Sequence, residues 1–336
     1  MIGWCRSMGV AVDMTKGVYR IGGIDIESTV LLPAPPSPPG VVPAAFIRCG
    51  AVADSLPDAA IKRVLCEASP TQCLLTIPGI ARYLVHGGTE IIVDARRDAA
   101  VGDVVRYLVT YAFAALCHQR QVLVLHATAV DIHGAAALFS GPSASGKSTL
   151  GAGLAARGHR VLCDDVCVID TSGESAVVHP ACAGLALWAD TLEQLGCVSV
   201  RDQREPYLSS PGVPAVFIGT PCLSAVPFSC LFLIAEADSS KLTIDVTEAR
   251  PVEALARLEA LTFMPFLITG LNRQAPNFVR CGRALRQAAV LTMARRWGFD
   301  SLPQVLDRIE SVVKTRTANA DQPAVRRSGN HQSATS

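Results

Sequence analysis

The sequence predicts an α/β protein whose central feature is a strand, a glycine-rich turn and a helix in direct succession. An apolar run at 135–140 leads into the turn at 141–149. A run rich in alanine and leucine, typical of a helix, follows at 147–157. A second apolar run at 160–169 then carries two adjacent aspartates in its middle. This order predicts a strand, turn, helix and returning strand.

Length and composition predict that the chain is a cytoplasmic globular protein. The chain has 336 residues, and half of them are apolar, so it can bury a large core. Thirty basic and 29 acidic residues leave a formal charge of +1, with no basic stripe to predict a nucleic-acid partner. Arginine and histidine interrupt the most apolar region, 104–130, so no membrane span is expected. The N-terminus has no signal-peptide pattern. Twelve scattered cysteines without a C-x-x-C pair predict buried thiols rather than a metal site.

The first 100 residues predict a β-rich N-terminal region. Apolar and polar residues alternate at 18–32, as in a half-buried strand or hairpin. Residues 72–95 predict short strands with a turn at 86–88. Between them, the proline-rich segment 33–43 predicts a stiff surface loop, in preference to a ligand for a recognition domain.

Residues 101–313 are expected to form the core domain. Apolar residues at helical spacing predict a buried helix at 103–120, and the strands at 121–130 and 135–140 follow it. The later elements are a strand and helix at 176–200 that Gly196 would cap, a long loop at 201–228, a strand at 230–237, and helical patterns at 251–262 and 282–313. The tail at 314–336 has almost no bulky apolar residue and predicts disorder.

The glycine-rich turn fits the pattern G-x-x-x-x-G-K-S/T. Its residues are Gly141, Pro142, Ser143, Ala144, Ser145, Gly146, Lys147, Ser148 and Thr149. Glycine permits turns in which successive N–H groups face inward around phosphate oxygens, and the helix that follows adds its positive end. Lys147 would contact the β- and γ-phosphates, and Ser148 can ligate Mg²⁺. The pattern therefore predicts a nucleotide site with Mg²⁺.

The aspartate pair is expected to lie close to these phosphates. The helix at 147–157 ends where Gly158 permits a left-handed cap, and eleven helical residues span about 16 Å. The returning strand has about that length. Successive strand residues point to opposite faces, so Asp164 and Asp165 should have different roles. A solvated surface pair is the alternative, but two carboxylates in an apolar strand are costly without partners.

His126 ends the apolar run in "VLVLHATAV". We expect its strand to lie beside the strand that enters the glycine-rich turn. The pattern alone leaves open whether His126 is a hydrogen-bonded core residue or a functional one.

The stretch "LHATAVDIHGAAALFSGPSASGKSTLGAGLAARGHRVLCDDV" resembles the catalytic core of HPr kinase/phosphorylase and the wider set of HPr-kinase-like proteins. These proteins share a nucleotide fold with phosphoenolpyruvate carboxykinase. The resemblance is strong over 121–170, weaker over 18–120, and fades after about residue 200. It implies an α/β fold with a P-loop core of the HPr kinase/phosphoenolpyruvate carboxykinase type and a smaller N-terminal β-rich region.

The resemblance also implies roles for the candidate residues. Asp164 would be the base that takes the proton from an attacking serine hydroxyl, Asp165 would help to bind the metal with Ser148, and His126 would lie near the acceptor. The implied activity is an ATP-dependent kinase of a serine on a small protein or peptide, either an HPr-like carrier or a ribosomal peptide precursor. A homo-oligomer remains open.

One departure from the family concerns the reverse reaction. The bifunctional enzymes carry a Glu and an Arg after the Asp-Asp strand, tied to metal binding and to phosphorylase activity. The matching segment here, "HPACAGLALW" at 179–188, has neither, so we expect little phosphorylase activity. Two other functions stay open: a non-catalytic protein that senses ATP, and a kinase of a small molecule.

Overall fold

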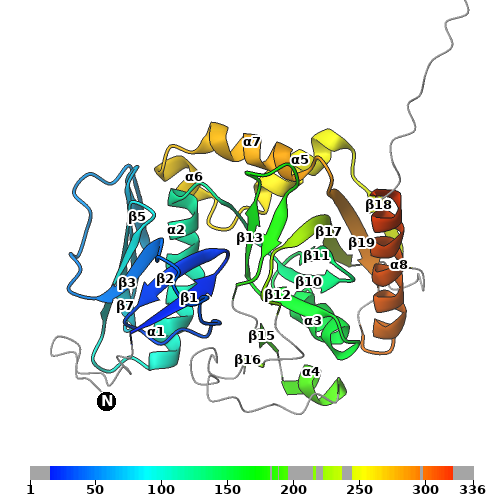
Figure 1. Ribbon diagram of the computed structural model, residues 1–336, viewed down its shortest axis with the longest axis horizontal. Helices are drawn as coiled ribbons and strands as arrows, with labels where there is room; N and C mark the ends of the chain where they lie inside the picture. The colour runs from blue at the N-terminus through cyan, green and yellow to red at the C-terminus, as the bar shows by residue number, and fades with distance from the viewer. Residues whose placement is uncertain are drawn as a thin grey trace, which may run out of the picture.

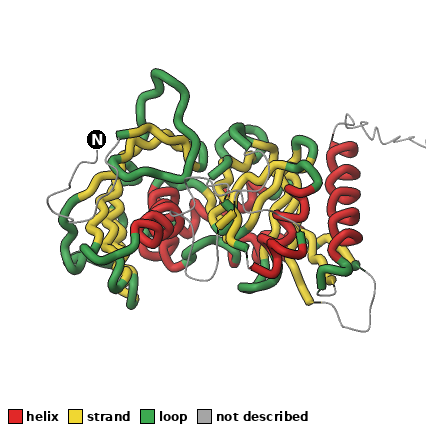
Figure 2. The backbone as a smooth tube through the Cα atoms, turned by 90° about the horizontal axis from the view of Figure 1, so that it is seen from below, coloured by secondary structure: helices red, strands yellow, loops and turns green. Residues whose placement is uncertain are grey.

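Two large β-sheets with helices between them make up most of the fold (Figure 1; Figure 2). The computed structural model describes residues 16–181, 184–187, 189–195, 215–216, 222–236, 244–295 and 298–320. The predicted Gly196 cap, most of the predicted loop at 201–228 and the end of the tail at 321–336 lie outside the described residues.

The first sheet is built from residues 17–95. Its strands are ordered β1-β2-β3-β8-β7-β6-β5-β4. Their bounds are β1 Gly17–Ile21, β2 Ile24–Ser28, β3 Ala45–Cys49, β4 Ile61–Arg63, β5 Cys66–Ala68, β6 Gln72–Ile77, β7 Ala81–His86 and β8 Glu90–Ala95. The hairpin of β1 and β2 and the strands β6 to β8 confirm the strands expected at 18–32 and 72–95, and burial alternates along β2, β7 and β8. The proline-rich segment between β2 and β3 forms no regular strand or helix.

A helical segment links the first sheet to the second. It consists of α1 Val101–Tyr107, the π-helical turn η1 Leu108–Ala112 and α2 Phe113–Gln119. This confirms the buried helix expected at 103–120. Every residue of α2 is buried, and one hydrophobic cluster includes side chains of both sheets and of this segment. The two sheets are therefore joined through a common core.

The second sheet surrounds the long strand β17. Its order is β12-β10-β11-β17-β14-β13-β9, with β19 on β17 and β18 on β19. The bounds are β9 Leu123–His126, β10 Thr128–Ile132, β11 Ala135–Ser140, β12 Arg160–Cys163, β13 Val166–Asp170, β14 Val177–His179, β17 Val226–Glu236, β18 Asp245–Glu248 and β19 Ala289–Arg295. β15 Leu185–Ala186 pairs with β16 Ala215–Val216 in a small separate sheet.

Two strands expected as continuous are each broken at the site. The region expected as one strand at 121–130 forms two strands, β9 and β10, which are separated by Ala127. The returning strand is likewise divided into β12 and β13, and the two aspartates lie in the gap. The expectation that the strand of His126 lies beside the strand entering the turn is also wrong. That strand, β9, pairs with β13, whereas β10 pairs with β11.

The remaining described helices follow the glycine-rich turn in the chain. They are α3 Lys147–Ala156, α4 Ala189–Gln194, α5 Pro251–Ala260, α6 Phe266–Gly270, α7 Gln274–Ala284 and α8 Leu302–Ala320. The prediction of one helical region at 282–313 is wrong, because β19 lies in its middle and pairs in parallel with β17. An apolar run buried on both faces has no alternation, so its pattern does not distinguish strand from helix. α8 also includes residues 314–320, which the sequence assigned to the disordered tail.

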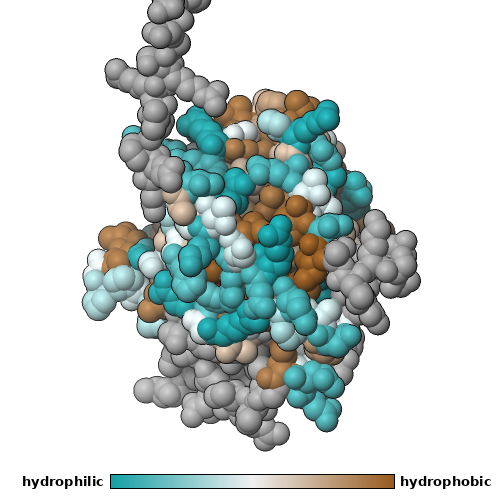
Figure 3. Space-filling view, turned by 90° about the vertical axis from the view of Figure 1, so that its right-hand side faces the viewer, coloured by the Kyte–Doolittle hydropathy of each residue, from teal (hydrophilic) through white to brown (hydrophobic). Residues whose placement is uncertain are grey.

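The surface on the side of α8 is mostly hydrophilic, with apolar side chains gathered near its centre (Figure 3). None of the described helices is both long and apolar enough to cross a membrane.

Candidate active site

The glycine-rich turn forms a cradle at the N-terminus of α3. Gly146 has a φ of 82° and is the residue before the helix, and Ala144 has a φ of 61°. A Cβ atom on Gly141 would lie 2.9 Å from Ser145 Oγ and 3.1 Å from the carbonyl oxygen of Ile234. The turn therefore needs glycine at this position. The first N–H groups of α3 have no acceptor within the helix, so the cradle fits a phosphate.

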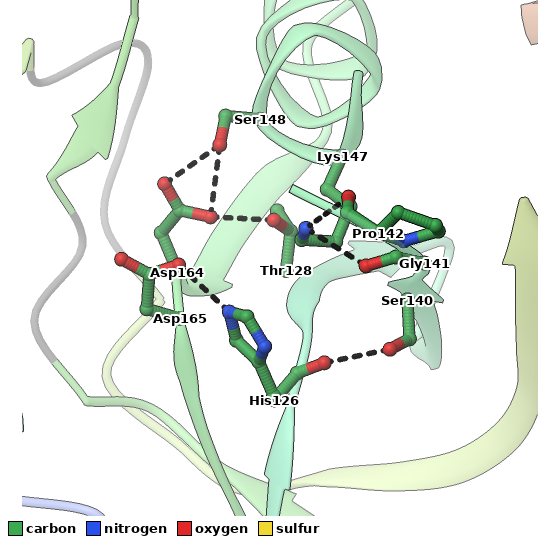
Figure 4. A network of polar contacts seen from close by, with 9 residues as sticks. All are labelled: His126, Thr128, Ser140, Gly141, Pro142, Lys147, Ser148, Asp164 and Asp165. Atoms are coloured by element: carbon green, nitrogen blue, oxygen red, sulfur yellow. Dashed lines mark hydrogen bonds and ion pairs between the residues drawn. The ribbon is translucent and has the colours of Figure 1, made fainter. Parts of the chain in front are cut away.

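The side chain of Lys147 bonds back to the turn that forms this cradle. Its side chain is buried, and its Nζ donates hydrogen bonds to the carbonyl oxygens of Gly141 at 3.2 Å and Pro142 at 3.1 Å (Figure 4). Two neutral carbonyl groups leave the ammonium charge uncompensated. The charge is therefore placed for an anion in the cradle.

Asp164 is bound to the beginning of α3 and to β10. Ser148 Oγ lies 3.2 Å from Asp164 Oδ1 and 3.0 Å from Oδ2, and it donates to this carboxylate. The hydroxyl of Thr128 also donates to Asp164 Oδ1 (Figure 4). The sequence did not single out Thr128, which contacts the carboxylate because β10 lies against α3 at this point.

Asp165 faces away from Asp164 and toward His126. Its φ of 65° turns the chain between β12 and β13, so the adjacent carboxylates separate. His126 Nε2 lies 3.3 Å from Asp165 Oδ1, and the two side chains are 43% and 50% exposed. The ring of His126 also meets Phe263 edge-on, with the ring centres 5.5 Å apart. The pair is therefore anchored at one side and open to solvent at the other.

A pocket of 340 Å³ joins these groups. The cradle, His126 and Asp165 form its polar wall, and Leu187, Phe299 and Leu302 contribute apolar side chains. Arg295 lines it as well.

Arg295 is a second candidate site residue that sequence reasoning missed. It is the last residue of β19, is buried, and donates from Nη2 to the carbonyl oxygen of Ser145 at 3.2 Å. Burial lowers the pKa of its guanidinium, which nevertheless remains a cation at neutral pH. Its signal in the sequence was an arginine at the end of the apolar run "AVLTMAR", and assigning that run to a helix concealed it.

The two cations and two carboxylates suit a nucleotide with Mg²⁺. Mg²⁺ in such sites usually takes one or two carboxylates together with substrate phosphates and water. Ser148 and Asp164 would hold the ion. Within the described residues there is no cluster of three or more His, Cys, Asp and Glu that would hold a metal alone, so the phosphates would have to complete this site.

Comparison with known proteins finds relatives of one family. The chain is 37% identical over 76 residues to the HPr kinase/phosphorylase of Pelodictyon phaeoclathratiforme, which is 23% of each protein. It is 32% identical over 96 residues to the HPr kinase/phosphorylase of Chloroherpeton thalassium, covering 28% of this chain and 27% of that one. The matches span about a quarter of the length of these relatives. They confirm the resemblance to the HPr-kinase-like family.

The chain is also similar to the solved HPr(Ser) kinase/phosphatase from Coxiella burnetii. That likeness covers 59% of this chain and 99% of the other, at 13% identity and a TM-score of 0.30. No family model matches the chain.

Proposed function

We propose that this chain, similar over part of its length to HPr kinase/phosphorylases, is an ATP-dependent kinase of a serine on a small protein or peptide. The observation that supports this most strongly is that the phosphate cradle and Asp165 line one pocket, while Asp164 accepts a hydrogen bond from Ser148 of the cradle. Phosphoryl transfer needs positioned positive charge around the transferred group and a carboxylate that orients the attacking hydroxyl.

The positive charges would neutralise the phosphates. Lys147 would exchange the two carbonyl groups of the turn for phosphate oxygens, and Arg295 would hold the turn through Ser145 while facing the same pocket. The apolar side chains of Phe299 and Leu302 would cover the nucleobase. These groups come from the turn, the first residue of α3, the end of β19 and the beginning of α8.

The two carboxylates would have different roles in metal binding and in positioning the acceptor. By the resemblance, Asp164 would take the proton from the serine hydroxyl and Asp165 would help to bind the metal. In the structure, however, the hydroxyl of Ser148 donates a hydrogen bond to Asp164, whereas Asp165 contacts His126. Asp164 would therefore act next to the metal, and Asp165 with His126 would position the acceptor.

The exposure of Asp165 and His126 favours a protein or peptide acceptor. Their side chains are about half exposed, so a hydroxyl on a large partner can reach them. A small-molecule kinase would be expected to bury these groups around its acceptor. A non-catalytic ATP sensor would have no use for a paired histidine and carboxylate at this edge.

The test is ATP consumption by the full chain with Mg²⁺, with and without candidate acceptors. The candidates are an HPr-type carrier and peptides encoded by neighbouring genes. Acceptor-dependent ADP release with phosphoserine on the acceptor supports the proposal. ATP binding without transfer to any acceptor would favour the sensor, and transfer only to a small molecule would favour the third function.

We further propose that the reverse reaction is weak. A phosphate-dependent reaction must hold two anionic groups at once, and it therefore needs more positive charge than forward transfer. Arg160 pairs with Asp131 and Arg280 lines a different cavity, so neither supplies that charge. Arg295 is a cation that the sequence argument did not include. Incubation of phosphorylated acceptor with enzyme, Mg²⁺ and phosphate should give little pyrophosphate, and release at the forward rate would contradict this expectation.

A further inference from the structure

A second cavity lies at the end of β9 and β13 that is opposite to the active site. His126 and Asp165 stand at one end of these strands, and Gln121 and Asp170 at the other. The cavity has a volume of 350 Å³. Its walls come from segments far apart in the sequence, namely the β1–β2 turn, the residues between α2 and β9, the ends of β13 and β14, and α7. We call it the arginine cavity, after Arg120, Arg280 and Arg283 in its lining.

The charges around the arginine cavity do not balance. Asp170 is the one carboxylate among its described lining residues, against three guanidinium groups. That carboxylate contacts Ser172 and His179 rather than the arginines. Its Oδ1 accepts a hydrogen bond from the N–H of Ser172 at 2.8 Å, and its Oδ2 lies 3.8 Å from Nε2 of His179. The lining therefore carries an excess of positive charge.

Two of the three arginines are held in place by neutral groups. Arg280 Nη2 donates to Oε1 of Gln121 at 2.7 Å. Arg120 Nη1 donates to the carbonyl oxygens of Gly88 at 3.0 Å and Ala44 at 3.3 Å. In the part of the chain that the structure describes, none of the three arginines is ion-paired with a carboxylate. These bonds orient the guanidinium groups without neutralising them.

Such an arrangement costs free energy when the cavity holds only water. Burial lowers the pKa of Arg280, and the neighbouring cations Arg273 and Arg283 lower it further. Like charges brought together in a partly buried place repel each other more strongly than in bulk water. An anion between them would remove this repulsion.

A third cavity of the molecule serves as a comparison. Arg82, Arg96 and Arg97 line it together with Asp54, Asp94 and Asp98. Arg82 is ion-paired with both Asp54 and Asp94. Three arginines in a cavity are thus compensated there by three carboxylates, and the arginine cavity has no such compensation among its described residues.

We propose that the arginine cavity binds a small phosphate-bearing anion. The planar guanidinium fork matches two phosphate oxygens at once, which makes arginine the preferred side chain for this group. Arg280 and Arg283 on α7 would take the phosphate from one wall, and Arg120 would face it from another. The volume admits a phosphorylated small molecule. This site is separate from the cradle and does not depend on the proposed function.

The experiment measures phosphate binding while the cradle is blocked. The full chain is saturated with a non-hydrolysable ATP analogue and Mg²⁺, and inorganic phosphate and pyrophosphate are then titrated by calorimetry. We expect binding that weakens as the salt concentration rises. The double variant Arg280→Gln, Arg283→Gln should weaken it by about tenfold or more, since charge-assisted hydrogen bonds are lost.

The double variant Arg96→Gln, Arg97→Gln is the matched control, because it removes the same two charges from the other cavity. It should leave phosphate affinity unchanged. If the double variant of Arg280 and Arg283 does not fold, Arg283→Gln alone serves, because this side chain belongs to an exposed residue of α7. Equal affinity in the wild type and the arginine variants, or no binding of either anion at millimolar concentration, would overturn the proposal.

Discussion

Asp164 and Asp165 are adjacent in the chain, yet they contact different partners. Asp164 accepts hydrogen bonds from Ser148 and Thr128, whereas Asp165 faces His126. The sequence predicted separate roles from the alternation of side chains along a strand. The structure gives another reason, because the positive φ of Asp165 breaks the strand between them.

Substitution of each aspartate by asparagine should separate the roles. Asp164→Asn should lower kcat strongly and raise the Mg²⁺ concentration needed for half-maximal turnover, because it removes the carboxylate beside Ser148. Asp165→Asn should retain the Mg²⁺ dependence and raise the KM for the acceptor. Nucleotide affinity should stay near that of the wild type in both. Turnover against Mg²⁺ and acceptor concentration is the measurement, and an unchanged kcat in Asp164→Asn would contradict the assignment.

His118 makes stability depend on pH. Burial lowers its pKa from 6.5 to about 4, although its hydrogen bond with the carbonyl group of Phe263 opposes this effect. Below pH 6.5 the unfolded chain takes up a proton that the folded chain does not. The stability contributed by this group is therefore present above pH 6.5 and falls as the pH decreases toward 4, by about 3 kcal/mol in total.

Urea unfolding at pH 7 and pH 4.5 tests this dependence. His118→Gln keeps an N–H donor for the carbonyl group of Phe263 but cannot be protonated, so its loss of stability between the two pH values should be smaller than that of the wild type. Equal losses in both proteins would show that other groups cause the effect.

At the scale of elements, α3 lies unusually close to β10. A Cβ atom on Gly151 would lie 2.8 Å from Cγ2 of Thr128. Thr128 holds Asp164 through its hydroxyl, and its branched side chain has few alternative rotamers. The approach of the helix to the strand therefore controls the geometry of the carboxylate.

Gly151→Ala should displace the side chain of Thr128 and, through it, Asp164. We expect a loss of about 1–3 kcal/mol in unfolding free energy and a lower kcat, because Thr128 and Asp164 must shift. Gly153→Ala is the control on the same helix, since its Cβ would meet only the ends of leucine side chains, with Leu306 at 2.9 Å and Leu302 at 3.7 Å. That variant should be within about 1 kcal/mol of the wild type, with alanine favouring the helix. Equal kcat values in the two variants would refute this coupling.

Local patterns in the sequence predicted the elements that they define directly. Turn chemistry located the cradle and α3, and alternation located the hairpin of β1 and β2. The pattern failed for β19, because a strand buried between β17 and β18 has no polar face. Arg295 was missed for the same reason. Thr128 could not be identified, because its role depends on the packing of α3 against β10.

At the scale of the whole molecule, the two large sheets share one hydrophobic cluster. Ile26 and Tyr83 of the first sheet belong to it together with Val168 and Leu231 of the second. The sequence suggested a boundary near residue 100, and α1 begins at Val101. The buried helices between the sheets nevertheless couple the two parts.

We predict that the chain unfolds in a single transition. Separation of the parts would expose the apolar faces of α2 and of both sheets, at a cost too large for either part to remain folded alone. Far-ultraviolet circular dichroism and intrinsic fluorescence should give coincident urea curves. Two transitions with different midpoints would indicate that the N-terminal region folds by itself.

The central claim is that the cradle delivers the γ-phosphoryl group of ATP to a serine. It is tested most directly by mass spectrometry of the acceptor after incubation with ATP, Mg²⁺ and either the wild type or Lys147→Ala, with ATP affinity measured in parallel. Lys147 would contact the phosphates both before and during transfer, so the variant should lose ATP affinity and phosphoserine formation together. Unchanged ATP affinity with full phosphoserine formation in Lys147→Ala, or no phosphoserine on any acceptor with a wild type that binds ATP, would contradict the account.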